Sequence, residues 1–434
     1  MTQPRLNASL ADALVDVPRR IALQGFMPGA AVTLHAALDH PDASRWESAA
    51  TFIADDAGQV DVALQAPVSG DWTQADATAP LWSLRRVTPP VHPERSEGVA
   101  PLQVALRAED RQGREAHAAL VLRFVAPGVQ RLEVRDEGLV GTLFMPAGEG
   151  PHPAVIVLAG SGGGLHEQRA ALYAAHGYAA LALGYFKVPG RPDFISDMPL
   201  EYFEKALQWV RRTQQPLHDF VAVSGVSRGG ELALLLGTHF PSLVSAVVAY
   251  VPSALVHGTL RAGRPDQPRD ATAWTLHGQP LPNAWAGNPH ADWTAFDQPA
   301  TPGAPIRQAR AFDSVQGDAA RVAAARIPVE RIAGPVLLIS GTDDGFWPSA
   351  AYAAQVAATL QAHGHRWPVT HVEGEGAGHA IGLPQLPATQ IAKPHPVAGL
   401  VLDGGGTPAA NARASEQSWA AVQRFLADAV KARA

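Results

Sequence analysis

Short apolar runs alternate with helix-forming segments from residue 154 to residue 374, and this alternation constrains the fold more than any other feature. Each run has the length of a buried strand and is bounded by glycine or proline. Between the runs lie segments such as EQRAALYAAHG, with apolar residues at helical spacing. Strands that are apolar throughout suit a parallel sheet covered by helices on both faces. The pattern predicts a doubly wound α/β domain. Its strands are residues 154–159, 178–183, 220–225, 244–251, 335–340 and 369–374.

The first 126 residues have a different pattern, in which alternating apolar residues are interrupted by turn residues. LQVALRAEDRQGREAHAALVLRFV reads as two alternating strands joined by a hairpin turn at DRQG. Several short strands at such spacing predict a β-sandwich. A chain of 434 residues also exceeds what one hydrophobic core usually supports. We therefore predict a sandwich domain at residues 1–126 and an α/β domain at residues 127–434.

Residues 257–330 interrupt the alternation between the fourth and fifth strands of the predicted parallel sheet. This segment is rich in proline, glycine and tryptophan. An irregular insertion of this length is typical of a lid or of a segment that faces substrate. A packed decoration remote from any site is the alternative, and the sequence leaves both open. An amphipathic helix over residues 414–434 is predicted to close the domain.

Composition excludes several classes of function. The chain has no cysteine, which removes disulfides, zinc–thiolate sites and thiol nucleophiles. Its formal net charge of −6 leaves no basic footprint, so we expect no nucleic-acid partner. The longest nearly apolar run, residues 244–256, is too short for a membrane span, and the first residues lack the apolar core of a signal peptide. We expect a soluble cytoplasmic protein without a cofactor or a bound metal.

The stretch VAVSGVSRGGELALLLG, residues 221–237, leads from a β-branched apolar run through a serine into a helix-forming run. It fits the nucleophile elbow, with Gly225 and Gly229 on either side of Ser227, a strand before and a helix after. The residues two before and two after the serine must be small so that helix and strand can approach. The elbow predicts a serine hydroxyl exposed at the carboxyl edge of the sheet. The alternative is a glycine-rich turn with a capping serine.

A nucleophilic serine needs a base and an acid that orients the base. Where a serine lies on such an elbow, acid and base follow in that order, each after a later strand. PVLLISGTDDGFWP places Asp343 and Asp344 beyond a strand, and VTHVEGEGAGHAIG places His379 in a glycine-rich loop. We assign Asp344 as the acid, with Asp343 as its turn-forming neighbour. We assign His379 as the base over its rival His371, which lies within a strand where sheet packing fixes the side chain.

Fixed N–H donors must stabilise the negative charge that develops on the carbonyl oxygen. One donor is the backbone amide of Arg228, directly after the nucleophile, and a second should come from the loop after the first parallel strand. That loop reads LAGSGGGLHEQR, which offers the amides of Ser161 and Gly162. A phosphate-binding loop is a rival interpretation, but the terminal Lys-Ser/Thr and the G-x-G-x-x-G spacing are missing. A second rival interpretation is that these glycines only form a tight turn between strand and helix.

These residues resemble the family of acyl-CoA thioesterases and bile acid-CoA:amino acid N-acyltransferases. The resemblance runs through GSGGGLHEQRAALYAAHGYAALALGYF, VSGVSRGGELALLLG, ISGTDDGFWPS and GEGAGHAIGLP. It is close over most of residues 130–430 and looser before them. It implies an immunoglobulin-like β-sandwich followed by an α/β-hydrolase domain, with the nucleophile at Ser227, the acid at Asp344 and the base at His379. The amino acid transferases of this family use cysteine and its thioesterases use serine, so the serine favours hydrolysis.

The resemblance implies an acyl-CoA substrate, cleaved to free acid and coenzyme A through an acyl-serine intermediate. A carboxylesterase or an acyltransferase with the same triad is the alternative, and a non-catalytic binding protein is a remote one. Residues 257–330 are longer than in animal members, so the acyl chain is not specified, nor is the oligomeric state. The final VKARA differs from a peroxisomal Ser-Lys-Leu address. Together with the alanine-rich composition, this favours a cytoplasmic bacterial member.

Overall fold

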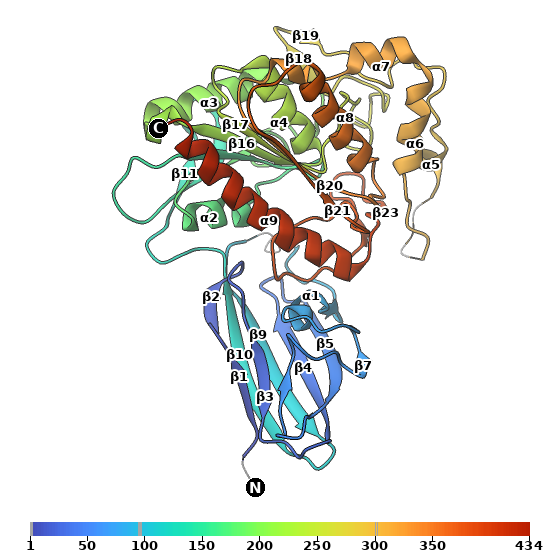
Figure 1. The fold of residues 1–434 in the computed structure, drawn as a ribbon. Coiled ribbons are helices and arrows are strands. Elements are labelled where there is room, and N and C mark those ends of the chain that lie inside the picture. Colours follow the sequence, from blue (N-terminus) through green and yellow to red (C-terminus); the bar gives the residue numbers. More distant parts are fainter. Residues whose placement is uncertain (1–2, 94–97, 300, 302) are drawn as a thin grey trace. The chain divides into compact units, whose positions relative to one another are not determined.

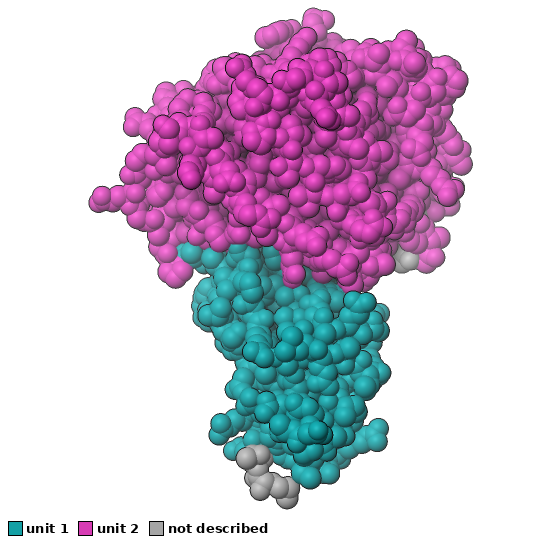
Figure 2. Space-filling view, viewed as in Figure 1, with its two compact units in different colours: residues 1–126, 382–390 teal, residues 127–381, 391–434 magenta. Residues whose placement is uncertain are grey.

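The computed structural model describes residues 3–93, 98–299, 301 and 303–434, and the chain divides into two compact units (Figure 2). The first unit is Met1–Ala126 with Gly382–Gln390. The second unit is Pro127–Ile381 with Ile391–Ala434. The sequence assigned residues 382–390 to the second domain, whereas the structure places this late segment in the first unit.

The first unit is built from two β-sheets. In the larger sheet the long strands alternate buried and more exposed residues, as expected when one sheet face lies on a core. The predicted hairpin at DRQG is confirmed, because the two strands around it pair antiparallel and Gly113 closes the turn with φ +75°. The smaller sheet contains β1 (Arg5–Ala8), β3 (Ile21–Gln24) and β6 (Val60–Asp61). The larger contains β2 (Asp12–Leu14), β10 (Glu115–Arg123), β9 (Leu102–Asp110), β4 (Ala31–Asp39), β5 (Arg45–Ile53), β7 (Ser69–Gly70) and β8 (Arg85–Arg86), and a short helix, α1 (Ala79–Trp82), precedes β8.

A buried arginine connects residues 382–390 to the rest of the first unit. Arg19 is 4% exposed, and its guanidinium donates to four backbone carbonyls and to Oε1 of Gln385 at 2.7 Å. The Gln385 side chain in turn donates to the Val17 carbonyl at 2.7 Å. These acceptors are neutral, and burial lowers the pKa of Arg19. The segment is therefore held by a hydrogen-bond network in which the bond from Arg19 to Gln385 is buried and the other bonds are partly buried.

Replacing Arg19 by methionine should lower the free energy of unfolding by about 2–4 kcal/mol, because several buried acceptors lose their donor. Urea denaturation measures the effect. Arg20→Met is the matched control, since this neighbouring arginine is exposed and its ion pair with Asp61 should contribute about 0–1 kcal/mol. Equal losses in the two variants would contradict the role given to Arg19.

The second unit is built on an eight-stranded sheet (Figure 1). The first three strands in spatial order pair antiparallel, and the others pair parallel. The six predicted strands of the parallel sheet are confirmed: residues 369–374 have the predicted ends, and the ends of the other five differ by at most two residues. Such a sheet, carrying a serine turn between a central strand and a helix, is an α/β-hydrolase fold. The spatial order is β11 (Gln130–Val134), β12 (Val140–Met145), β14 (Ala179–Gly184), β13 (Ala154–Leu158), β16 (Val221–Val226), β17 (Ala246–Tyr250), β20 (Val336–Gly341) and β21 (Val369–Gly374).

Helices cover both faces of this sheet (Figure 1). One face carries α2 (Glu167–Ala175) and α9 (Pro408–Lys431), and the other carries α3 (Leu200–Gln214), α4 (Arg228–His239) and α8 (Ser349–Ala362). The closing helix begins at Pro408 rather than at residue 414, because Thr407 caps it by accepting a hydrogen bond from the Ala410 amide. In the described ranges, no helix combines the length and the apolar content that a membrane-crossing segment requires.

The insertion between β17 and β20 packs around its own aromatic cluster. The Trp285 ring lies 4.6 Å from that of Trp293 and 5.2 Å from that of Phe312, centroid to centroid. The insertion is therefore an ordered part of the second unit with a core of its own. Its elements are β18 (Trp274–Leu276), β19 (Gln279–Pro280), α5 (Thr294–Asp297), α6 (Ala309–Ser314), η4 (Val315–Gly317) and α7 (Ala319–Ala325), with η5 (Val329–Arg331) leading into β20. Elsewhere in the unit lie β15 (Met198–Pro199), β22 (Ala392–Pro394), β23 (Val401–Asp403), η2 (Asp136–Gly138) and η3 (Leu217–Asp219).

Candidate active site

Ser227 lies in a strained turn between β16 and α4. Its backbone has φ +59° and ψ −119°, a conformation that residues other than glycine rarely adopt. The Ser227 amide donates to the Tyr250 carbonyl at 2.9 Å, which fixes the turn to the neighbouring strand. A Cβ on Gly225 would lie 1.9 Å from the Gly229 carbonyl oxygen, and one on Gly229 would lie 2.5 Å from that of Ala159. Both positions admit only glycine, for the steric reason that the elbow pattern predicted.

The structure brings Asp344 and His379 together. Nδ1 of the imidazole lies 2.8 Å and 2.9 Å from the two carboxylate oxygens, and both side chains are at least nine-tenths buried. Asp343 instead pairs with Arg307, and this ion pair lowers the pKa of the Asp343 carboxyl group. His371 lies in β21 and bonds to a serine hydroxyl of the sheet at 2.7 Å. Of the candidates weighed in the sequence, Asp344 and His379 therefore form the pair.

The imidazole of His379 is oriented with one nitrogen left unpaired. A carboxylate only accepts hydrogen bonds, so Nδ1 carries the proton and Nε2 presents a lone pair. Nε2 is buried and, among the described residues, has no hydrogen-bond partner, so no such bond reaches Ser227. The ring stacks on Phe346 with centroids 4.4 Å apart. The nitrogen that a general base needs is thus free and shielded.

The loop after β13 lies directly beside the nucleophile. A Cβ on Gly160 would lie 3.2 Å from Cβ of Ser227. The amides of Ser161 and Gly162 have no acceptor in the described part of the chain. The Arg228 amide begins a helix and therefore lacks an intrahelical acceptor. The three amides that the sequence singled out are all unpaired in this region.

The hydroxyl of Ser161 bonds to His395, a residue that sequence reasoning missed. Its Oγ lies 2.8 Å from Nε2 of His395. Nδ1 of the same ring accepts hydrogen bonds from the backbone amides of Val397 and Ala398 at 3.3 and 3.2 Å. Burial, assisted by the charge of Arg261, lowers the pKa of His395 to about 4. The neutral ring carries its proton on Nε2, and this N–H donates a hydrogen bond to the Ser161 oxygen. The Ser161 hydroxyl is therefore able to donate its own hydrogen bond to another acceptor.

The side chain of Arg228 belongs to a buried hydrogen-bond network. It donates to Glu231 at 2.8 Å and to the carbonyls of His257 and Gly258 at 3.2 and 2.7 Å. Glu231 also accepts the indole N–H of Trp274 at 2.7 Å. Burial raises the pKa of Glu231, and the Arg228 guanidinium opposes this. The network links the helix that carries the nucleophile to the insertion.

Replacing Glu231 by glutamine should destabilise the protein by about 3–5 kcal/mol, because Arg228 would keep a buried charge without its counter-ion. Thermal or urea unfolding measures this. Glu375→Gln is the control, since Glu375 is exposed and its loss should change the unfolding free energy by less than about 0.5 kcal/mol. If the Glu231 variant were as stable as this control, the network would not hold the insertion.

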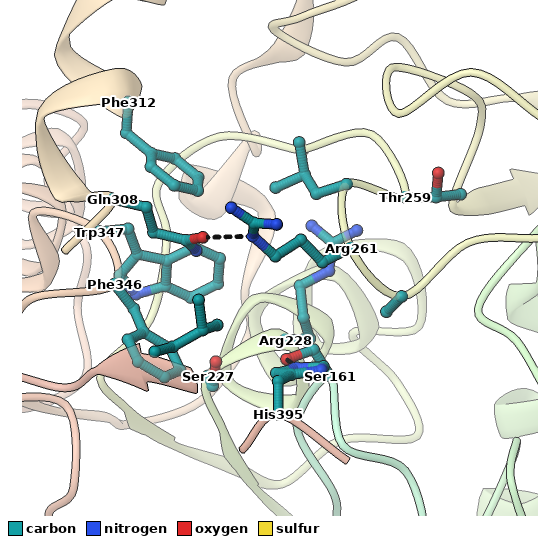
Figure 3. A pocket seen from close by; sticks show the side chains of 13 residues that line it. Ser161, Ser227, Arg228, Thr259, Arg261, Gln308, Phe312, Phe346, Trp347 and His395 are labelled. Carbon is teal, nitrogen blue, oxygen red and sulfur yellow. Dashed lines mark hydrogen bonds between the residues drawn. The ribbon is translucent and has the colours of Figure 1, made fainter. Parts of the chain in front are cut away.

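A pocket lies over Ser227 (Figure 3). The space between its side chains amounts to about 410 Å³, including a part open to solvent. The insertion supplies six of the lining residues, so its substrate-facing interpretation fits the structure and the remote decoration does not. Phe346 and Trp347, which follow Asp344 by two and three positions, were not recognised as lining residues. The lining is Ser161, Ser227, Arg228, Thr259, Leu260, Arg261, Ala262, Gln308, Phe312, Phe346, Trp347, His395 and Leu402.

Comparison with known proteins identifies the family. Residues 198–432 match the family model described as BAAT / acyl-CoA thioester hydrolase C terminal, and residues 16–136 match acyl-CoA thioester hydrolase/BAAT N-terminal region. Acyl-coenzyme A thioesterase 6 of Mus musculus is 32% identical over 95% of this chain and 93% of its own length. Acyl-coenzyme A thioesterase 1 of Homo sapiens is 31% identical with the same coverage. A solved sugar hydrolase from Lactococcus lactis matches with a TM-score of 0.39, 16% identity, and coverage of 69% of this chain and 99% of that one. The matches to both family models and the relatives above 30% identity establish that the chain belongs to the acyl-CoA thioester hydrolase/BAAT family.

Proposed function

We propose that this protein is a serine hydrolase that cleaves acyl-CoA thioesters to free acid and coenzyme A. The observation that carries the proposal is the pair of His379 and Asp344, which leaves the imidazole Nε2 free, in the same fold as an elbow serine at position 227. The names of the relatives supply the thioester substrate. A serine at the elbow, where the transferases of the family carry cysteine, favours water as the acceptor.

The reaction begins when Nε2 of His379 takes the proton of Ser227 and the Ser227 oxygen attacks the thioester carbonyl carbon. Asp344 holds the imidazole tautomer and stabilises the imidazolium. This step needs Nε2 within hydrogen-bond reach of the hydroxyl, a contact that in many enzymes tightens only when substrate binds. The negative carbonyl oxygen is stabilised by the amides of Arg228 and of Ser161 or Gly162.

Collapse of the tetrahedral intermediate breaks the carbon–sulfur bond and releases coenzyme A as the thiol, with the proton from His379. The acyl group remains as an ester on Ser227. His379 then takes a proton from water, and the resulting hydroxide attacks the ester carbonyl carbon to give a second tetrahedral intermediate. Its collapse breaks the bond to the Ser227 oxygen and releases the free acid, while His379 returns the proton to Ser227.

We also infer that the first unit contains an immunoglobulin-like β-sandwich within residues 1–126. Two sheets support this inference, the larger with alternating burial along β4 and β9. Residues 127–434 carry the hydrolase machinery, with the exception of the segment at 382–390.

Wild-type protein should release free thiol from acyl-CoA and react covalently with a fluorophosphonate probe. Asp344→Asn should lower kcat by about 10⁴-fold through loss of the correct imidazole tautomer, and Ser227→Ala should abolish labelling. Asp343→Asn is the matched control and should keep nearly full activity, because that carboxylate bonds to Arg307.

Turnover of p-nitrophenyl esters without turnover of any thioester would assign the triad to an esterase instead. Product formation that requires an added amine would indicate an acyltransferase. Absence of probe labelling in wild type would leave a binding protein. Each of these results would overturn the proposal.

The Ser161 hydroxyl should act as an additional donor to the carbonyl oxygen, since His395 already donates to it. Ser161→Ala should lower kcat by about 10²-fold with little change in KM, because the contact strengthens in the transition state. Ser161→Thr keeps a hydroxyl and should recover most of the rate. An equal loss in both variants would show that side-chain volume, not the hydroxyl, matters there. The kinetics are measured by thiol release.

A further inference from the structure

Arg261 lines the same pocket as Ser227 but takes no part in the reaction described above (Figure 3). It comes from the insertion, directly after Leu260, whose backbone has φ +52°. This conformation is unfavourable for leucine and is held by a hydrogen bond from the Leu260 amide to the Arg269 carbonyl at 2.7 Å. The chain is thus held in a strained turn at the residue that precedes Arg261.

The guanidinium of Arg261 is surrounded by neutral groups. Nε donates to Oε1 of Gln308 at 3.0 Å, and Nη2 donates to the Ala295 carbonyl at 3.0 Å. The group also lies over the Phe296 ring, 4.8 Å from its centroid. Within the described residues, no carboxylate lies within 4.0 Å of it and Nη1 has no hydrogen-bond acceptor. Arg261 is therefore a half-buried cation with an unused donor and no counter-ion.

The neighbouring charged side chains do not neutralise the positive charge of Arg261. Asp297 is the acidic group whose field reaches Arg261, but its carboxylate pairs with Arg269 at 2.6 Å. Burial lowers the pKa of Arg261 to about 10, so the group stays charged at neutral pH. Arg228, which lines the same pocket, has Glu231 as its counter-ion at 2.8 Å. Burying a charge without a counter-ion costs free energy. An anionic group on the ligand would pair with this arginine and offset that cost.

We infer that Arg261 binds a carboxylate at the far end of the acyl chain, so that the preferred substrates are thioesters of dicarboxylic acids. The inference rests on the proposed thioester hydrolysis. Leu260, Phe312 and Trp347 line the same pocket and offer apolar contacts to the methylene groups between the reacting carbonyl and this carboxylate. Arginine binds a phosphate group in the same way as a carboxylate, so a phosphate of coenzyme A is the other ligand with suitable chemistry. These apolar neighbours favour the acyl group, because they match a hydrocarbon chain and not a nucleotide.

The test compares dicarboxylyl thioesters with monocarboxylyl thioesters of the same chain length, each on coenzyme A and on N-acetylcysteamine, which has no phosphate. Wild type should prefer the dicarboxylyl member of each pair on both carriers. Arg261→Met should lower kcat/KM for dicarboxylyl thioesters by about 10- to 100-fold while monocarboxylyl thioesters are cleaved as well or better. The ratio of the two rates does not depend on how much of the variant is folded.

Arg212→Gln is the matched control, since this arginine is exposed, pairs with Glu137 and lies outside the pocket lining, and its ratio should equal that of wild type. Arg261→Lys should retain part of the preference because the charge remains. An unchanged ratio in Arg261→Met would overturn the inference. So would a loss that follows the coenzyme A carrier whatever the acyl group, which would make a phosphate the ligand.

Binding separates this inference from the proposed function. In the Ser227→Ala background, calorimetry should give tighter binding of the dicarboxylyl than of the monocarboxylyl thioester, and Arg261→Met should abolish the difference. Failure of wild type to cleave any thioester, with this binding difference intact, would contradict the hydrolase and not the anion site. Hydrolysis without a binding difference would contradict the anion site alone.

Discussion

The close approach of β16 and α4 is the contact on which the rest of the site depends. Gly225 and Gly229 allow it, since a side chain at either would collide with backbone. The missing side chain of Gly229 also faces the carbonyl of Ala159, at the end of β13. One steric requirement therefore positions the serine turn and brings the loop that carries Ser161 against it. Ser227 and the loop that carries Ser161 therefore share a single packing contact.

A second link joins the chemistry to the wall of the pocket. Arg228 directly follows Ser227, and its guanidinium donates to Glu231 and to the carbonyls of His257 and Gly258. Arg261 follows these carbonyls by only a few residues. The pocket wall at residues 259–262 is therefore connected by hydrogen bonds to the helix that follows Ser227, so substitutions at this wall are constrained by the stability of the elbow.

Much of this arrangement follows from local sequence patterns. The parallel strands were predictable because each is a short apolar run with its own boundaries, and the pairing of Asp344 with His379 followed from chain order after the elbow. His395 and Arg261 could not be found this way. Each contacts partners that are distant in sequence. His395 is one of seventeen histidines and Arg261 lies in an irregular insertion, so no periodic pattern marks either residue. The early start of α9 did have a signal, the Thr407-Pro408 pair, which the helical period alone did not reveal.

The segment at 382–390 has a consequence for the order in which the protein is made. Domains commonly fold from the N-terminus during synthesis. Here Arg19 and Gln385 are separated by 366 positions, so the guanidinium lacks one of its acceptors until residue 385 has left the ribosome. The first unit thus reaches its final structure late, on the emergence of a stretch that begins three residues after His379. Maturation of the N-terminal sheets and completion of the loop that carries His379 are coupled in time by the connectivity of the chain.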